Sequence, residues 1–128
     1  MTVHITGNHV LGNDEGVITP NAWANCNGGA STSGNPSLLK SSNISGLTDS
    51  GVGSYTLAFT SNMNTALYGW VTQTHHGGSQ NDVGIMQEHD ATTTVVGSCR
   101  LTNFHALNTA TTFTVQDSEL FTAVFFDT

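Results

Sequence analysis

The stretch Asn43–Gln73, NISGLTDSGVGSYTLAFTSNMNTALYGWVTQ, decides the fold of this chain. Its centre, Tyr55–Thr60, alternates large apolar side chains with small or polar ones, which is the pattern of a strand with one buried face. The glycines of the preceding Asp49–Gly53 stand where a reversing chain needs positive φ, so they predict a hairpin with the segment Ile44–Leu47. Leu67–Val71 is aromatic and β-branched enough to be the next strand, and the three strands are expected to form a meander.

The rest of the chain adds short strand candidates, and no window keeps the 3.6-residue period of a helix for three turns. Strands are expected at residues 83–86, 92–101, 111–115 and 119–126, while residues 103–108 are expected to form a loop or another strand. The aromatic residues expected in the core are Tyr55, Phe59 and Phe113. With turn signals between them, these segments predict one all-β domain over residues 21–128, an antiparallel β-sandwich or a jelly-roll-like barrel.

Residues 1–20, MTVHITGNHVLGNDEGVITP, alternate only weakly and break at several glycines. They carry too little apolar surface to hold a strand in place by themselves. We expect an N-terminal extended arm that becomes ordered against a neighbouring subunit or another protein, and an ordinary edge strand is the alternative. The segment has no basic and apolar blocks of the kind found in a signal peptide, so none is expected.

The chain is acidic and poor in charge. Nine Asp and Glu residues stand against Lys40 and Arg100, for a formal net charge of -7, and charged residues make up 9% of the chain. Binding to nucleic acid or to an anionic membrane surface requires a basic face, so neither partner is expected. No apolar run approaches the length of a membrane span.

Neither the histidines nor the cysteines form a recognised metal motif. The densest group of ligand-type residues is His75, His76, Asp82, Glu88, His89 and Asp90. Its spacing matches no zinc signature, so no metal ion and no cofactor is expected, and a histidine on a three-fold axis is the remaining route to a metal site. Cys26 and Cys99 are expected to be buried thiols, with one disulfide as the alternative.

The sequence contains no pattern typical of a hydrolase. It has no Gly-x-Ser-x-Gly elbow, and Asp49-Ser50-Gly51 lies in a predicted hairpin turn. A glycosidase pair would have to be drawn from Asp82, Glu88, Asp90 or Asp117, which no motif connects. We therefore expect a protein without enzymatic activity.

Two segments resemble a module that recurs in tailed-phage virion proteins, especially at the distal end of tail fibres. There a Trp-Val-Asn-Phe-Asn-Gly-type segment leads into an Asn-Val-Ser-Ser-Val-Thr-Asp-Asn-Gly-Thr-Gly-Asp-Tyr-Thr-Val-type segment. Here the first is Ala22–Gly28, AWANCNG, and the second is Ser42–Thr60, SNISGLTDSGVGSYTLAFT. The resemblance covers about residues 22–72, and it departs at Cys26, where an aromatic residue is usual, and in the lack of a repetitive shaft upstream. It implies a virion surface protein, often trimeric and without catalysis, made in the cytoplasm of a bacterial host.

The most apolar run of the chain is Glu119–Phe126, ELFTAVFF. A strand that is apolar on both faces needs both faces covered, either inside the sandwich or at a subunit interface. We expect a homotrimer in which this strand contributes to the interface. The residues expected there are Leu120, Phe121, Val124 and Phe125.

The segment Thr74–Asp82 has no periodicity and nothing apolar to bury, so it is expected to be a long exposed loop between two strands. Planar donors and acceptors in it suit sugar hydroxyls. The residues expected to form a surface recognition loop are His75, His76, Gln80, Asn81 and Asp82. Tyr68 or Trp70 would supply a stacking face for the sugar, although packing in the core is the more ordinary role for Trp70.

These observations predict a non-enzymatic phage virion structural protein exposed on the particle surface as a homotrimeric β-rich knob. Its other expected partners are virion proteins of the capsid or the tail. The resemblance indicates a tail-fibre or spike tip that binds host-surface glycan, whereas a short chain beginning at Met1 without a shaft indicates a capsid decoration, or cement, protein. A free carbohydrate-binding module, or lectin, is the alternative, and a metal-dependent hydrolase ranks after it.

Overall fold

In the computed structural model, the described part of the chain comprises residues 19–30, 35–75, 82–90, 92–107 and 111–127. All of the regular secondary structure in these residues is β-strand. The strands are β1 (Ala22–Asn27), β2 (Ser37–Ser42), β3 (Ile44–Gly51), β4 (Ser54–Phe59), β5 (Gly69–His75), β6 (Asp82–Glu88), β7 (Ser98–Leu107), β8 (Thr114–Val115) and β9 (Leu120–Phe126). Residues 1–18 lie outside the described part, so the expected arm is represented only by the exposed Thr19 and Pro20.

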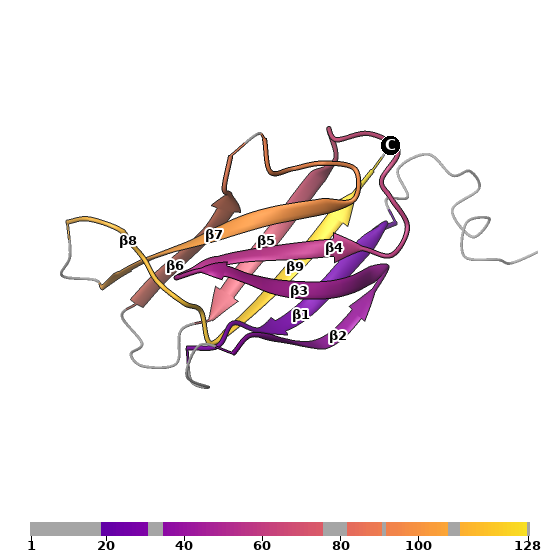
Figure 1. The fold of residues 1–128 in the computed structure, drawn as a ribbon. Coiled ribbons are helices and arrows are strands. Elements are labelled where there is room, and N and C mark those ends of the chain that lie inside the picture. The colour runs from indigo at the N-terminus through magenta and orange to yellow at the C-terminus, as the bar shows by residue number, and fades with distance from the viewer. Residues whose placement is uncertain (1–18, 31–34, 76–81, 91, 108–110, 128) are drawn as a thin grey trace, which may run out of the picture.

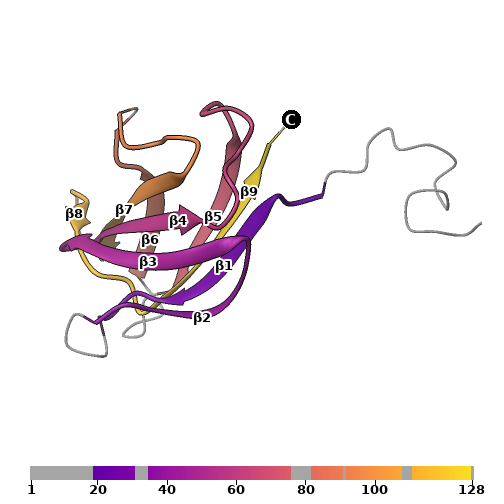
Figure 2. The ribbon, with the colours of Figure 1, turned by 45° about the vertical axis from the view of Figure 1, so that its right-hand side comes forward.

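The strands form two antiparallel sheets that pack together as two layers (Figure 1). Sheet A has the strand order β2-β1-β9-β5, and sheet B has the order β3-β4-β7-β6, with β8 paired to β7. A turned view shows the two layers from the side (Figure 2), and the sheets do not close into a barrel. The all-β sandwich predicted from the sequence is therefore confirmed.

The β3–β4 hairpin is the one that the alternating pattern predicted. Gly51 and Gly53 have φ angles of 124° and 63°, in the left-handed region that glycine adopts without steric strain. The large side chains of β4 are inward and buried, as expected: Tyr55, Leu57 and Phe59. Turn chemistry and alternation were sufficient signals here, because both act within a few residues.

The predicted meander is wrong at its third strand. β4 pairs with β7, whereas β5 crosses to sheet A and pairs with β9. The crossing segment, residues 60–68, carries two buried side chains, Met63 and Tyr68. The Tyr68 ring packs edge-on against Phe59 and Phe125, and its hydroxyl donates to the Ser98 carbonyl at 2.9 Å. Burying these residues makes the segment cap one end of the sandwich instead of turning back along sheet B.

Residues 92–101 are not one strand, contrary to the prediction. The chain turns at Thr92, whose N–H donates to the Asp90 carboxylate at 2.8 Å, and it turns again between Val95 and Ser98, which form an isolated bridge. β7 begins only at Ser98 and then continues through the segment that was expected as a loop or a separate strand. The β-branched run was overridden because the Asp90 side chain binds backbone groups and so favours a turn.

Smaller differences concern the edges of the sheets. β2 was not predicted, because only Leu38 of SLLKSS contacts the core and its other side chains are exposed. Of the predicted strand 111–115, only Thr114–Val115 is paired. Phe113 is 51% exposed and does not belong to the core, because it lies just before this two-residue strand at the edge of sheet B.

The core lies between the sheets and is centred on β9, which has β1 and β5 as neighbours. Aromatic rings fill its centre: the Phe125 ring lies 5.1 Å from that of Phe59, and the Phe121 ring lies 4.8 Å from that of Tyr55. The buried apolar residues are Ala22, Ala24, Cys26, Ile44, Tyr55, Leu57, Phe59, Met63, Tyr68, Met86, Cys99, Leu101, Phe121, Ala123 and Phe125.

Candidate functional site

The outer face of sheet A is the first candidate site. We define it by the outward positions of β1, β9 and β5, which alternate with buried positions along β1 and β9. These positions are Trp23, Asn25, Asn27, Gly69, Val71, Gln73, His75, Leu120, Thr122, Val124 and Phe126. None of them is acidic, although the chain has nine acidic residues.

An apolar row crosses this face. Trp23 and Val71 both lie opposite Val124, one on each neighbouring strand, so the three side chains stand side by side. Directly opposed side chains on one face are in contact distance, about 5 Å between Cβ atoms. Val71 is 61% exposed and Leu120, further along β9, is 43% exposed. The face therefore presents aliphatic groups to solvent beside a half-buried tryptophan.

Two of the four predicted interface residues are wrong. Phe121 and Phe125 point inward and are 3% and 0% exposed within one chain, so they belong to its core and are not available to a partner. Leu120 and Val124 occupy the outer face of the same strand. The sequence shows that both faces of this strand are apolar, but it does not show which face the sandwich covers.

The predicted recognition loop is only partly within the described residues. His75 is the last residue of β5 and Asp82 is the first of β6, so the loop joins sheet A to sheet B. His76, Gln80 and Asn81 lie outside the described residues, and the Asp82 side chain does too. His75 has an exposed side chain whose Nδ1 lies 3.8 Å from a carboxylate oxygen of Glu119.

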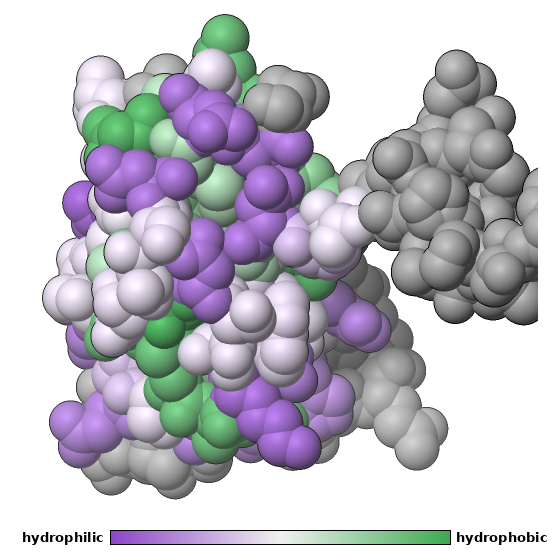
Figure 3. Space-filling view, turned by 90° about the vertical axis from the view of Figure 1, so that its right-hand side faces the viewer, coloured by the Kyte–Doolittle hydropathy of each residue, from purple (hydrophilic) through white to green (hydrophobic). Residues whose placement is uncertain are grey.

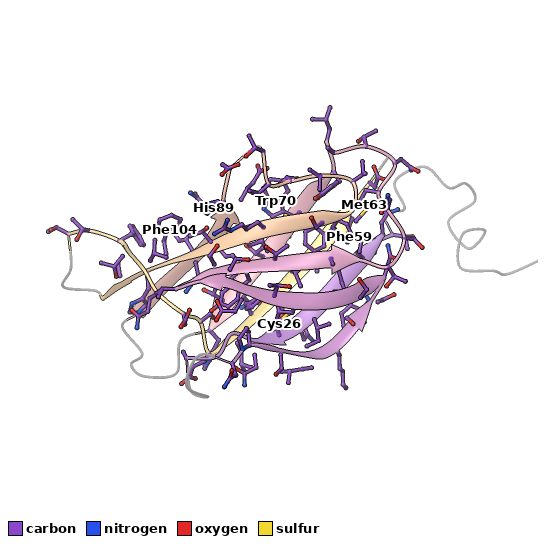
Figure 4. All side chains as sticks on the ribbon, in the orientation of Figure 1. Cys26, Phe59, Met63, Trp70, His89 and Phe104 are labelled. Atoms are coloured by element: carbon purple, nitrogen blue, oxygen red, sulfur yellow. The ribbon has the colours of Figure 1, made fainter. Side chains whose placement is uncertain are left out.

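A second apolar region lies on the outer side of sheet B, where β6, β7 and β8 run side by side. Ile85 and Val115 both lie opposite Phe104, one on each neighbouring strand. Together with Gln87 and Phe113, Ile85 and Phe104 line a shallow hollow of about 220 Å³. Figure 4 places Phe104 near the β8 end of the sandwich, away from Met63 at the opposite end. This region was not predicted from the sequence, because Phe113 was expected in the core.

A third candidate lies at the end of the sandwich where β5 begins and β6 ends. A hollow of about 390 Å³ is lined there by Ala66, Leu67, Tyr68, Trp70, Glu88 and Thr94. Trp70 points inward, is half-buried and packs against the core, while Val71 points outward. This agrees with the expectation that Trp70 packs in the core. Glu88 was not expected near it, because the two residues are brought together only by the crossing between the sheets.

The described residues were searched for a metal site and for carboxylates that could act as an acid–base pair. They contain no group of three or more His, Cys, Asp and Glu side chains placed to hold a metal ion. Asp117 accepts a hydrogen bond from the Gly53 N–H at 2.6 Å, and hydrogen bonds from Thr92 hold the pKa of Asp90 below its usual range. Both carboxylates thus serve turns.

The two cysteines are buried free thiols, one in each sheet. This agrees with the expectation of buried thiols, to which a disulfide was the alternative. Burial raises the pKa of Cys26 to about 12 and that of Cys99 to about 11. Neither thiol has the lowered pKa or the exposure of a reactive cysteine.

The comparisons with known proteins add no identity: no family model, no curated protein and no solved structure matches the chain. Within the part of the chain that the structure describes, no helix has the length and apolar character to cross a membrane.

Proposed function

We propose that this protein is a structural protein of a tailed-phage virion surface and assembles as a homotrimer through the outer face of sheet A. The carrying observation is the composition of that face: aliphatic and aromatic side chains form its central row, and no acidic residue occupies an outward position of β1, β9 or β5. Charged residues are depleted and aromatic residues are enriched in the buried centres of protein interfaces.

Exposed aliphatic side chains alone would be unremarkable on any protein surface. Their grouping in one row beside Trp23 is what distinguishes this face, because tryptophan is among the residues that most often dominate binding energy at an interface. Trp23 is half-buried, so part of its side-chain freedom is already lost before association.

The trimeric state draws support from the second apolar region on sheet B. A closed ring of three identical subunits is built from a head-to-tail contact, in which one surface meets a different surface of the next copy. The outer face of sheet A and the cluster of Ile85, Phe104, Phe113 and Val115 are two such surfaces on different sheets. A two-fold dimer would need only one of them.

Two positions on the virion are proposed for this protein: the tip of a tail fibre or spike, and the capsid surface. The resemblance of residues 22–72 to the distal module of tail fibres supports the tip, and the hollow beside Trp70 supports a receptor-binding role there. A free lectin is the second candidate function, and the same hollow favours it.

A matched pair of valines tests the assembly. Val71 and Val52 are 61% and 68% exposed, but Val71 lies in the row on sheet A and Val52 lies in the β3–β4 turn. We expect Val71→Asp to convert the trimer to a monomer by light scattering, because the carboxylate would be desolvated at the interface. Val52→Asp should remain trimeric, and both should keep the circular dichroism of the wild type.

A wild-type protein that is monomeric at micromolar concentration overturns the assembly proposal. Equal masses for the Val71 and Val52 variants would place the interface elsewhere. Phe113→Asp distinguishes a ring from a dimer, because only the ring is expected to need both apolar regions. A trimer that survives this substitution would exclude the sheet B cluster from the contact.

A further inference from the structure

The hollow at the start of β5 brings together two residues from different sheets. Trp70 and Glu88 both occupy inward positions of their strands, next to Thr72 and Met86. The Thr72 hydroxyl donates to the Met86 carbonyl at 2.9 Å, which holds β5 and β6 together just below the pair. Figure 4 shows Trp70 and His89, the residue that directly follows Glu88, along the same upper side of the sandwich. The hollow is thus built on two rigid strands.

The polar groups around the hollow fall into two classes. The single proton of the Tyr68 hydroxyl is shared between the Ser98 carbonyl at 2.9 Å and the Val95 carbonyl at 3.2 Å, so it is already used. In contrast, no side chain or backbone group of the described residues makes a hydrogen bond to the Glu88 carboxylate or the Trp70 indole N–H. Glu88 is half-buried. Burial and the neighbouring Cys99 raise the pKa of Tyr68, and the Glu88 charge adds a smaller effect in the same direction. The hollow therefore offers one acceptor, one donor and an aromatic surface to a ligand.

An uncharged sugar residue matches this set. A pyranose ring presents an apolar C–H face that stacks on an indole, while hydroxyl groups around its edge donate to a carboxylate and accept from an N–H. The volume of about 390 Å³ lies at the small end of the range for ligand pockets, so it suits one or two sugar residues. An acidic sugar would be repelled by Glu88.

An organic cation is the competing ligand, because it binds both aromatic faces and carboxylates. Aromatic cages for such cations surround the charge with several ring faces. Here the Tyr68 ring packs against Phe59 and Phe125 in the core, which leaves the exposed part of the half-buried Trp70 as the aromatic surface that lines the hollow. Leu67, which is 92% exposed, and Ala66 add an apolar rim that suits a sugar face better than a hydrated cation.

We propose that this hollow binds one uncharged sugar residue, with the Trp70 indole as the stacking surface and the Glu88 carboxylate as the acceptor for its hydroxyls. This proposal specifies the ligand for the receptor-binding role of the proposed function. It rests on that role only for the source of the sugar, the host surface. It also moves recognition away from the predicted loop. His75 ends the strand that Trp70 begins, so at about 3.3 Å per residue the two lie roughly 16 Å apart.

Nuclear magnetic resonance of the full chain tests the proposal directly. The chain has two tryptophans, so ¹⁵N-labelled protein gives two indole N–H signals, and Trp70→Phe assigns them. Methyl glycosides of glucose, mannose, galactose and N-acetylglucosamine are added one at a time, at millimolar concentrations. At least one should shift the Trp70 signal and leave the Trp23 signal in place.

Matched substitutions then test the carboxylate. Glu88→Gln keeps the shape of the side chain but removes its charge, and the affinity for the bound glycoside should fall about tenfold, because hydrogen bonds to charged groups are the stronger ones. Glu119→Gln makes the same change at the His75 end and should leave the affinity unchanged. Neither substitution removes a core contact, so both variants should fold.

Three results overturn the proposal: no glycoside shifts the Trp70 signal, tetramethylammonium shifts it when no glycoside does, or Glu119→Gln weakens binding while Glu88→Gln does not. The first leaves the hollow without a sugar, the second assigns it to a cation, and the third moves the sugar to the His75 end. Light scattering reports separately on assembly. A trimer without sugar binding would retain the assembly proposal, and a sugar-binding monomer would retain this one as a free lectin.

Discussion

The two outer faces of the sandwich treat their polar groups in different ways. On sheet B, Arg100 organises a network across β3, β4 and β7: its Nε donates to the Ser54 hydroxyl at 2.8 Å and its Nη2 to the Ser50 carbonyl at 3.1 Å. The hydroxyls of Ser50 and Thr56 lie 2.7 Å apart in the same network. The polar side chains in this part of the face therefore bind one another, and the solvent can supply their remaining hydrogen bonds.

Where the outer face of sheet B has the Arg100 network, the outer face of sheet A has an apolar row, Trp23, Val124 and Val71. The polar pair beside it is a single hydrogen bond from the Thr122 hydroxyl to the Asn25 side chain at 2.9 Å. On the side of the molecule that Figure 3 shows, the right-hand side of Figure 1, apolar groups reach the surface as separate areas among polar ones. The two faces therefore differ in how many of their polar groups bind one another, and this difference, more than exposure alone, is what supports the proposed interface on sheet A.

The largest loss of stability is expected in the core between the two sheets, and it sets the scale for substitutions on either outer face. Phe125 is fully buried and packs against Phe59 and Tyr68, so Phe125→Ala should lower the free energy of unfolding by about 3–5 kcal/mol. Urea denaturation followed by circular dichroism measures it. A loss below about 1 kcal/mol would contradict the placement of this strand at the centre of the core. Phe125→Asp should prevent folding and not merely dissociate a trimer.

The network on sheet B gives the next largest effect. Arg100→Met removes two hydrogen bonds from a charged donor, so the free energy of unfolding should fall by about 1–3 kcal/mol while the oligomeric mass stays unchanged. Lys40→Met is the matched control, because it removes the other basic side chain at an exposed position of β2. Equal stability of the two variants, or dissociation of the Arg100 variant, would remove the distinction between the faces.

The elements predicted correctly are those with local signals. Alternation at Tyr55, Leu57 and Phe59 identified β4 and its buried face, and the glycines at 51 and 53 identified its turn. The apolar run 119–126 identified β9 almost to its ends. In each case the information lies within about ten residues, and the side-chain period of two residues fixes the faces relative to each other.

The remaining features depend on contacts between distant segments. Nothing within residues 60–68 indicates that Met63 and Tyr68 cap the sandwich, because their partners Val96 and Ser98 are some thirty residues further along the chain. For the same reason the sequence did not place Glu88 beside Trp70 or decide which face of β9 is inward. Candidate interface and ligand sites therefore required the pairing of the sheets, not the strand signals alone.

Raising the pH tests the burial of one thiol in each sheet, because both thiols have a raised pKa in the folded protein. The folded protein raises the pKa of Cys26 and Cys99, so the unfolded chain loses these protons first as pH rises above about 9. The stability that each protonated thiol contributes is present below that pH and is lost up to about pH 12 for Cys26 and about pH 11 for Cys99. At about pH 10 the loss should be about 1 kcal/mol for each thiol.

Urea denaturation of Cys26→Ala and Cys99→Ala at pH 7 and pH 10 isolates the thiols from the tyrosines. Each variant should lose about 1 kcal/mol less than the wild type over this change, because alanine has no proton to release. Both thiols should also resist a thiol reagent at pH 7 until urea unfolds the chain. Rapid labelling of one thiol in the folded protein would contradict burial of the sheet that carries it.

The smallest effect is expected at His75, where the outer face of sheet A ends. Its side chain is 66% exposed and its pairing with Glu119 at 3.8 Å is solvated, so His75→Ala should change the free energy of unfolding by about 0.5 kcal/mol or less. The recognition-loop hypothesis adds that replacing His75 and His76 by alanine reduces sugar binding, whereas a sugar in the Trp70 hollow predicts unchanged affinity, because that hollow lies at the other end of β5. Calorimetric titration with the glycoside that shifts the Trp70 signal separates the two, with Glu88→Gln as the variant that must lose affinity. A drop of more than about 1 kcal/mol in the stability of the histidine variant would instead mean that these side chains are buried or share a metal ion where three subunits meet.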